Sequence, residues 1–154
     1  MRKPVKALVL SATLCAGVFV ASPASAAAAP YSPEAACAET AGYGGWTNAT
    51  DGRRTLKTPF GDTFGYVQLM WNGSRGTNCV ATIKTAFAGT STRTNATLRI
   101  EGGGTHKDER GYKYYAAVVR KAAGKCVAYS GFTFDTRQDA TSAHGGRSSY
   151  GNCG

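Results

Sequence analysis

The sequence lacks the patterns that mark metal proteins and the common serine hydrolases. Only two of its 154 residues are histidine, and no pair of cysteines has the C-x-x-C spacing of a zinc or redox site. No G-x-S-x-G string surrounds a serine, and no glycine-rich loop follows a strand and opens a helix. We therefore expect no metal site and no cofactor.

Helical periodicity is nearly absent as well. Only Pro33–Thr40 has a helical pattern, with Ser32 as its N-cap and Glu34 near the favourable end of the helix dipole. The later sequence consists of short runs of β-branched and aromatic residues, which Gly, Asn, Asp and Ser separate. This pattern predicts an all-β fold: a single small antiparallel β-sandwich or barrel with a short N-terminal helix.

About six strands are expected. They lie near Arg53–Thr58, Tyr66–Trp71, Cys79–Ala86, Ala96–Glu101, Tyr112–Lys121 and Lys125–Phe134. Tyr114–Val119 is apolar on both faces, so we place it in the middle of the sheet. Gly102–Gly111 would be an exposed hairpin loop, and Asp135–Ser149 an irregular segment that wraps the domain.

Residues 1–26 have the pattern of a signal peptide. Three basic residues precede the apolar run Ala7–Val20, and Ala24–Ala26 offers the small residues that signal peptidase requires. The apolar run is too short for a permanent span, so we expect no transmembrane segment in the mature protein. Residues 27–154 would then form a single secreted β domain.

Four cysteines remain after the expected cleavage, because Cys15 lies in the signal peptide. An even number of cysteines in a small exported domain predicts two disulfides among Cys37, Cys79, Cys126 and Cys153. Three connectivities are possible. We prefer Cys37–Cys153, which would hold the two ends of the domain together, and Cys79–Cys126, which would join two core strands.

The chain is basic, with 18 Lys and Arg against nine Asp and Glu. Removal of the signal peptide takes away three basic residues and leaves a net charge of +6. The basic residues are spread along the chain, so the charge favours weak attraction to anionic surfaces. It does not predict specific nucleic-acid recognition.

One segment carries most of the groups that acid–base chemistry would need. A small ribonuclease or other hydrolase could use Glu101 as base, His106 or His144 as acid, and Arg99 to bind phosphate. However, the segment around Glu101 and His106 is charged and glycine-rich, as exposed loops are. We therefore predict no catalytic residue, and keep a hydrolase that uses Glu101 and His106 as an alternative.

Aromatic residues suggest a different kind of site. Trp46, Trp71, Tyr112 and Tyr115 could face a flat ligand such as a sugar ring. The competing interpretation, which we favour, is that these rings form the core of a domain that has few Leu and Ile residues. A further alternative is a protease inhibitor that presents Asn72–Thr77 or Gly102–Gly111.

Several segments resemble a known family. The order of an early Cys, "GYVQLMWNGSRGTNCVATIK", "DERGYKYYAAVV", "AGKCVAYSG" and a terminal Cys is similar to the actinomycete spore-associated protein A family, over Cys37 to Gly154. The resemblance implies a small exported β domain found with spores or the outer cell surface, and it implies no catalytic residue.

The leading hypothesis is thus a non-enzymatic extracellular protein of the cell or spore surface. Its role would be structural or binding, and its expected partners are polymers of the cell wall or spore surface. The oligomeric state is left open.

Overall fold

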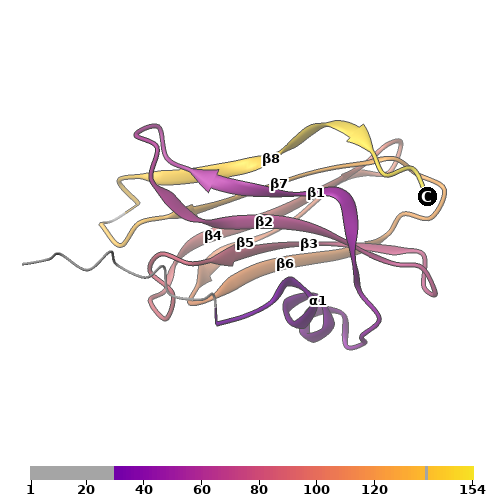
Figure 1. Ribbon diagram of the computed structural model, residues 1–154, viewed down its shortest axis with the longest axis horizontal. Coiled ribbons are helices and arrows are strands. Elements are labelled where there is room, and N and C mark those ends of the chain that lie inside the picture. The colour runs from indigo at the N-terminus through magenta and orange to yellow at the C-terminus, as the bar shows by residue number, and fades with distance from the viewer. Residues whose placement is uncertain (1–29, 138) are drawn as a thin grey trace, which may run out of the picture.

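The computed structural model describes residues 30–137 and 139–154, so the expected signal peptide lies outside the described residues. A single eight-stranded antiparallel sheet forms most of the fold, and one short helix packs against it (Figure 1). The elements are α1 (Pro33–Ala41), β1 (Thr47–Lys57), β2 (Thr63–Asn72), β3 (Thr77–Lys84), β4 (Thr92–Ile100), β5 (Gly104–Tyr112), β6 (Tyr115–Lys121), β7 (Val127–Phe134) and β8 (Ser142–Gly151). The all-β prediction is confirmed, with eight strands in place of about six.

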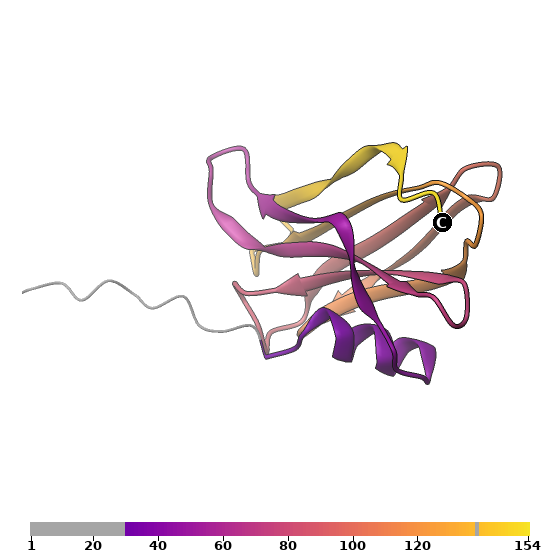
Figure 2. The same cartoon turned by 45° about the vertical axis from the view of Figure 1, so that its right-hand side comes forward.

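The sheet is rolled into a nearly closed barrel. Its strand order is β5-β4-β7-β8-β1-β2-β3-β6, so β5 and β6 are the two end strands. These end strands lie against each other without a hydrogen-bonded ladder, which leaves a seam in the barrel wall. In a second view, α1 lies outside the barrel on the side opposite β8 (Figure 2).

Apolar side chains from alternate positions fill the inside of the barrel. The core is formed by Leu56, Phe64, Val67, Leu69, Val80, Ala96, Leu98, Ile100, Ala116, Val118, Ala122, Val127, Tyr129 and Ala143. Burial of each large side chain stabilises the fold by roughly 1.5–3 kcal/mol. The period of two along the strands thus produces one closed core.

A second apolar layer lies outside the barrel, beneath α1. It contains Ala36, Cys37, Trp46, Met70, Cys79, Ala81, Ile83 and Ala117. This layer explains why Tyr114–Val119 is apolar on both faces: Val118 faces the barrel core, and Ala117 faces the helix. We predicted that this segment lies in the middle of the sheet, and that prediction was wrong, because β6 is an end strand. Its outer face is apolar because α1 covers it.

The helix begins at Pro33, as the sequence predicts, and ends at Ala41, one residue later than expected. The Ser32 hydroxyl accepts a hydrogen bond from Ala35 N at 3.1 Å, and Pro33 occupies the first turn. Gly42 ends the helix in the left-handed region (φ 75°), where glycine is favoured, and its N–H donates to Ala38 O.

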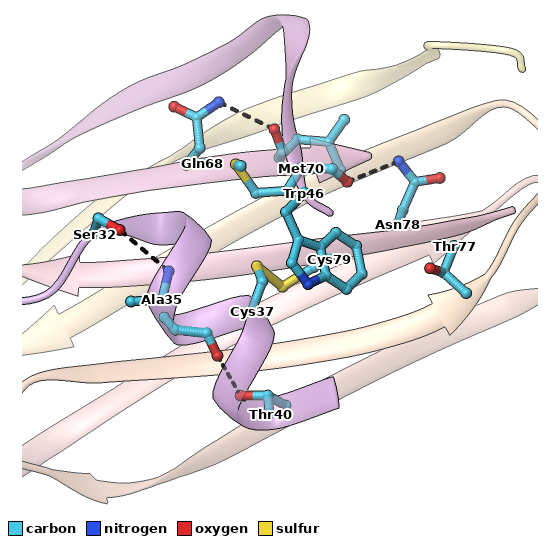
Figure 3. Close-up of a disulfide and its surroundings, with 12 residues drawn as sticks. Ser32, Ala35, Cys37, Thr40, Trp46, Gln68, Met70, Thr77, Asn78 and Cys79 are labelled. Carbon is cyan, nitrogen blue, oxygen red and sulfur yellow. Dashed lines mark hydrogen bonds between the residues drawn. A yellow bond between two sulfur atoms is a disulfide. The ribbon is translucent and has the colours of Figure 1, made fainter. Parts of the chain in front are cut away.

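Both preferred disulfide pairings were wrong. The bonds are Cys37–Cys79 and Cys126–Cys153. Cys37 faces β3 because α1 packs on the outer face of that strand, and Figure 3 shows this disulfide between helix and sheet. Cys126 precedes β7 and Cys153 follows β8, and these strands are antiparallel neighbours, so the second bond closes their shared end.

Two predicted irregular segments are strands. Most of Gly102–Gly111 belongs to β5, whose alternating charged residues suit a strand at the edge of a sheet. Much of Asp135–Ser149 belongs to β8, which pairs with β7 despite its many Gly and Ser residues. A Cβ at Gly145 would lie 2.6 Å from Thr55 O, so glycine allows close approach of the neighbouring backbone there.

Candidate functional site

The seam between β5 and β6 opens into a pocket of about 500 Å³ beside α1. We call it the seam pocket. Four tyrosines line it: Tyr31, Tyr112, Tyr114 and Tyr115. Charged side chains of both signs complete the wall, namely Glu39, Asp108, Arg110 and Lys113. The pocket exists because β5 and β6 are joined by only two residues yet do not pair.

Three of the tyrosines form a cluster at one side of the seam pocket. The Tyr31 ring, which precedes α1, has its centroid 5.5 Å from that of Tyr114 and 5.0 Å from that of Tyr115. Burial, followed by the nearby Glu39 carboxylate, raises the pKa of Tyr115. Tyr115 therefore presents a neutral hydroxyl at neutral pH, while Tyr114 is 36% exposed at the rim.

A second part of the pocket lining is a hydrogen-bonded polar group on β5. The Tyr112 hydroxyl donates to Asp108 Oδ2 and accepts from Arg110 Nε, both at 2.5 Å. These residues share one face of β5 because their spacing is two. Burial, followed by the hydrogen bond to Asp108, raises the pKa of Tyr112. The three side chains thus hold one another in place before any ligand binds.

The four aromatics proposed from the sequence lie in three places. Tyr112 and Tyr115 line the seam pocket together, and their contact with a ligand stays a prediction. Trp46 is 8% exposed beneath α1, stacks on Tyr43 and donates its Nε1–H to Tyr43 O, as a core residue does. Trp71 is half-buried beside the C-terminal residues, outside the seam pocket.

Several seam-pocket residues had no recognisable sequence pattern. Tyr31 and Glu39 come from the N-terminal segment, whereas Asp108 and Arg110 come from a segment predicted to be a loop. The alternation of Asp108, Arg110 and Tyr112 was the only available clue, since it places three polar groups on one strand face.

The acid–base residues proposed for a hydrolase are dispersed. Glu101 is exposed in the turn between β4 and β5. His106 lies on β5, where its Nδ1 accepts from Arg120 Nε at 3.3 Å, and its Nε2 faces Gly103 O at 3.2 Å. Among the described residues no hydrogen bond joins Glu101 to His106, so the geometry does not assemble the proposed pair.

The other two hydrolase candidates have structural contacts elsewhere. Arg99 donates to Ser148 O at 2.7 Å, which links β4 to β8. His144 lies on β8, 2.7 Å from Ser142 Oγ, and packs against the Phe132 ring. Over residues 30–137 and 139–154, no three His, Cys, Asp or Glu side chains gather closely enough to hold a metal ion.

Of the two segments proposed for an inhibitor, one is a turn with an exposed tip and the other is mainly strand. Asn72–Thr77 is a tight connection in which Asn72 Oδ1 accepts from Arg75 N and Ser74 Oγ. Gly102–Gly111 is mainly strand, as described above. In the described part of the chain, no helix is long and apolar enough to span a membrane.

Comparison with known proteins gives one informative relative. The chain is 36% identical over 119 residues to spore-associated protein A of Streptomyces coelicolor, and the match covers 75% of this chain and 70% of that protein. No protein-family model and no solved structure matches the chain.

Proposed function

Because the chain belongs to the spore-associated protein A family, we propose that it is a secreted, non-catalytic protein of the spore or cell surface that binds surface polysaccharide in its seam pocket. The observation that carries the binding role is the convergence of four tyrosines with charged side chains in one open pocket. The relative's name describes a spore protein and not an enzyme.

The chemistry of the seam pocket suits a sugar. A sugar ring presents C–H faces that pack on aromatic rings, and hydroxyls that hydrogen-bond to carboxylates and guanidinium groups. The Tyr31–Tyr114–Tyr115 cluster offers the rings, and Asp108 and Arg110 offer the polar groups. A volume of about 500 Å³ lies within the usual range for small-ligand pockets.

Preorganisation supports the same interpretation. The Asp108–Tyr112–Arg110 hydrogen bonds fix side chains that would otherwise lose rotamer freedom on binding. The two disulfides suit a domain that works outside the cell, where thiols are oxidised.

Binding of the protein to isolated cell walls and spore coats tests the proposal. The purified protein is mixed with isolated cell walls and spore coats, and the bound fraction is measured with soluble wall polysaccharides as competitors. We expect Tyr114→Ala to lower the affinity about tenfold, because it removes a ring from the pocket rim. Tyr150→Ala is the matched control, since Tyr150 is also exposed (47%) but lies on β8.

Either of two results would refute the proposal. One is a wild-type protein that stays wholly in solution with both materials. The other is a folded Tyr114→Ala variant that is retained as well as the wild type and as Tyr150→Ala. Circular dichroism of each variant establishes that the fold is intact.

A further inference from the structure

A second pocket, of about 530 Å³, lies at the other end of β6 from the seam pocket and shares no residue with it. We propose that it binds the phosphate groups of a phosphodiester-linked surface polymer. Arg75, from the turn between β2 and β3, and Arg120 and Lys121, from the end of β6, bring three positive charges to it. We call it the cationic pocket.

The cationic pocket contains no balancing negative charge. Its other lining residues are Tyr43, Ser74, Thr77 and Val119, none of which is acidic. Six basic residues of the described chain have a carboxylate partner, among them Arg54 with Asp51, Arg93 with Glu109, and Arg137 with Asp135. Within the described residues, by contrast, no carboxylate lies within 4.0 Å of the charged groups of Arg75, Arg120 or Lys121. Mutual repulsion of three such cations disfavours the arrangement, and a bound anion would offset it.

The position of Arg75 is fixed by its surroundings. Its guanidinium carbon lies 4.1 Å from the centre of the Tyr43 ring, and the Tyr43 hydroxyl is hydrogen-bonded to Thr77 Oγ1 at 3.1 Å. Thr77 is only 6% exposed, so this hydroxyl pair forms a buried floor. Asn72 Oδ1 accepts from Arg75 N at 3.0 Å and holds the turn itself.

The β6 side of the cationic pocket is fixed as well. Ala122 N and Ala123 N both donate to Gly76 O, at 3.0 and 3.2 Å, which ties the turn to the chain directly after Lys121. Arg120 donates to Val119 O and to His106 Nδ1, and these bonds set the plane of its guanidinium group. The two segments that carry the three basic residues are therefore held together by the backbone, before an anion is present.

The geometry favours a phosphate over a carboxylate. The donors reach the pocket from two separate segments, the turn that carries Arg75 and the end of β6 that carries Arg120 and Lys121. A tetrahedral phosphate can direct oxygens to several such donors at once, whereas a planar carboxylate presents two oxygens in one plane.

The same geometry disfavours nucleic acid as the source of the phosphate. Proteins that bind single strands place aromatic rings where bases can stack. The single ring that lines this pocket belongs to Tyr43, and the Arg75 guanidinium covers it. A polymer of alcohol phosphates needs no stacking surface, so it suits this pocket better.

Binding to three soluble polyanions of equal charge tests the inference: poly(glycerol phosphate), polygalacturonate and single-stranded RNA. We expect the wild type to bind poly(glycerol phosphate) about tenfold more tightly than either of the others. Its affinity should fall as the salt concentration is raised from about 50 to 200 mM. Equal binding of the RNA or of the carboxylate polymer would overturn the assignment to alcohol phosphates.

Arg75→Gln should weaken the binding of poly(glycerol phosphate) about tenfold. The matched control is Arg53→Gln, because Arg53 also packs on a tyrosine, with its guanidinium carbon 3.7 Å from the Tyr66 ring centre, but lies outside the pocket. An equal loss in both variants would mean general charge attraction and would overturn the site. So would an unchanged affinity in folded Arg75→Gln.

Two additional variants keep the test decisive. Lys121→Gln replaces an exposed side chain, so it serves if Arg75→Gln fails to fold, and it should also weaken phosphate binding. Tyr114→Ala, which tests the seam pocket, should leave phosphate binding unchanged. Failure of the polysaccharide proposal and failure of the phosphate inference are thus distinguishable.

Discussion

The two sides of the barrel differ in what lies on their outer face. On β2, β3 and β6 the outward residues are apolar and α1 covers them; we call this the covered wall. On β4, β7 and β8 the outward face has no helix and carries residues such as Arg93, Thr97 and His144; we call this the bare wall. One continuous sheet thus acquires two surface chemistries from the position of a nine-residue helix.

Both candidate sites lie at the border of the covered wall. The seam pocket includes Glu39 and Thr40 of α1, and the cationic pocket includes Tyr43, which follows the helix. Along each margin of a helix that packs on a barrel, side chains of the helix and of the strands can line a surface hollow without filling it. A hollow of about 550 Å³ also lies over β7 and β8 on the bare wall, but no residue of the helix lines it.

Releasing the helix from the covered wall should have the largest effect on stability. Replacing Cys37 and Cys79 by Ala should lower the free energy of unfolding by about 4–5 kcal/mol, because both are fully buried and the bond closes a loop with a sequence separation of 42. Replacing Cys126 and Cys153 should cost less, about 3.5 kcal/mol, because that bond closes a shorter loop of 27 at an exposed end. Urea denaturation of both double variants measures the difference. A difference no larger than the roughly 0.4 kcal/mol expected from loop length alone would mean that burial of Cys37 and Cys79 under the helix adds nothing.

Lys84 belongs to the covered wall but points into the barrel. It is fully buried, and its Nζ donates to Thr90 O at 2.7 Å and Tyr112 O at 2.9 Å. Burial lowers the pKa of Lys84 to about 8. Between pH 8 and 10 the unfolded chain therefore binds more protons than the folded protein, so the free energy of unfolding rises with pH.

We expect this rise to be roughly 2 kcal/mol relative to Lys84→Met over the same pH range. The comparison with the variant matters because burial raises the pKa of Tyr129 and of Tyr115, which lowers stability at still higher pH in both proteins. Chemical denaturation at several pH values gives the difference. A constant difference between the two proteins would show that Lys84 does not titrate in this window.

The sequence predicted those features that depend on neighbouring residues. Ser32 and Pro33 define the start of α1 locally, and the alternation in β3 identifies its two faces. The disulfides could not be predicted, because Cys37 meets Cys79 only after the helix has packed on the outside of the barrel. The partner of each cysteine therefore depended on tertiary packing.

The missed strands and the missed site have a related cause. A strand is recognised in a sequence by the alternation of apolar and polar residues, and β5 and β8 show little of this alternation. β5 is a charged end strand, and β8 is rich in glycine and serine. Tyr112 and Tyr115 could be proposed as ligand contacts from their type alone. Their convergence with Tyr31 depends on the seam, which has no signature in the sequence.

The two walls touch where β7 has a glycine. Gly131 faces Thr82 of β3 across the barrel, and a Cβ at position 131 would clash with Thr82 Oγ1. We expect Gly131→Ala to cost about 1–3 kcal/mol through overpacking. Adding Thr82→Ala should recover at least about 1 kcal/mol, because it removes the clashing hydroxyl, which has no hydrogen-bond partner among the described residues.

Thermal denaturation of the two single variants and the double variant measures this coupling between the walls. Gly44→Ala is the control, since a Cβ there meets no atom within 4 Å. Additive effects of the two substitutions would mean that the walls do not touch at this point.

The smallest expected effect belongs to the bare wall. Arg93 joins Glu109 of β5 through Nε at 2.8 Å, and this bond lowers the pKa of Glu109. Because the Arg93 side chain is 51% exposed, Arg93→Ala should cost only about 0.5 kcal/mol, and less at high salt. The stabilisation is present above the ordinary pKa of a glutamate and is lost as the pH falls through the lowered value, so the variant should match the wild type in acid. An NMR titration of the Glu109 carboxyl, with Lys125→Ala as the charge control, checks the shift. A loss above about 2 kcal/mol would show that this pair stabilises the bare wall as a covering element does, and the contrast between the two walls would fail.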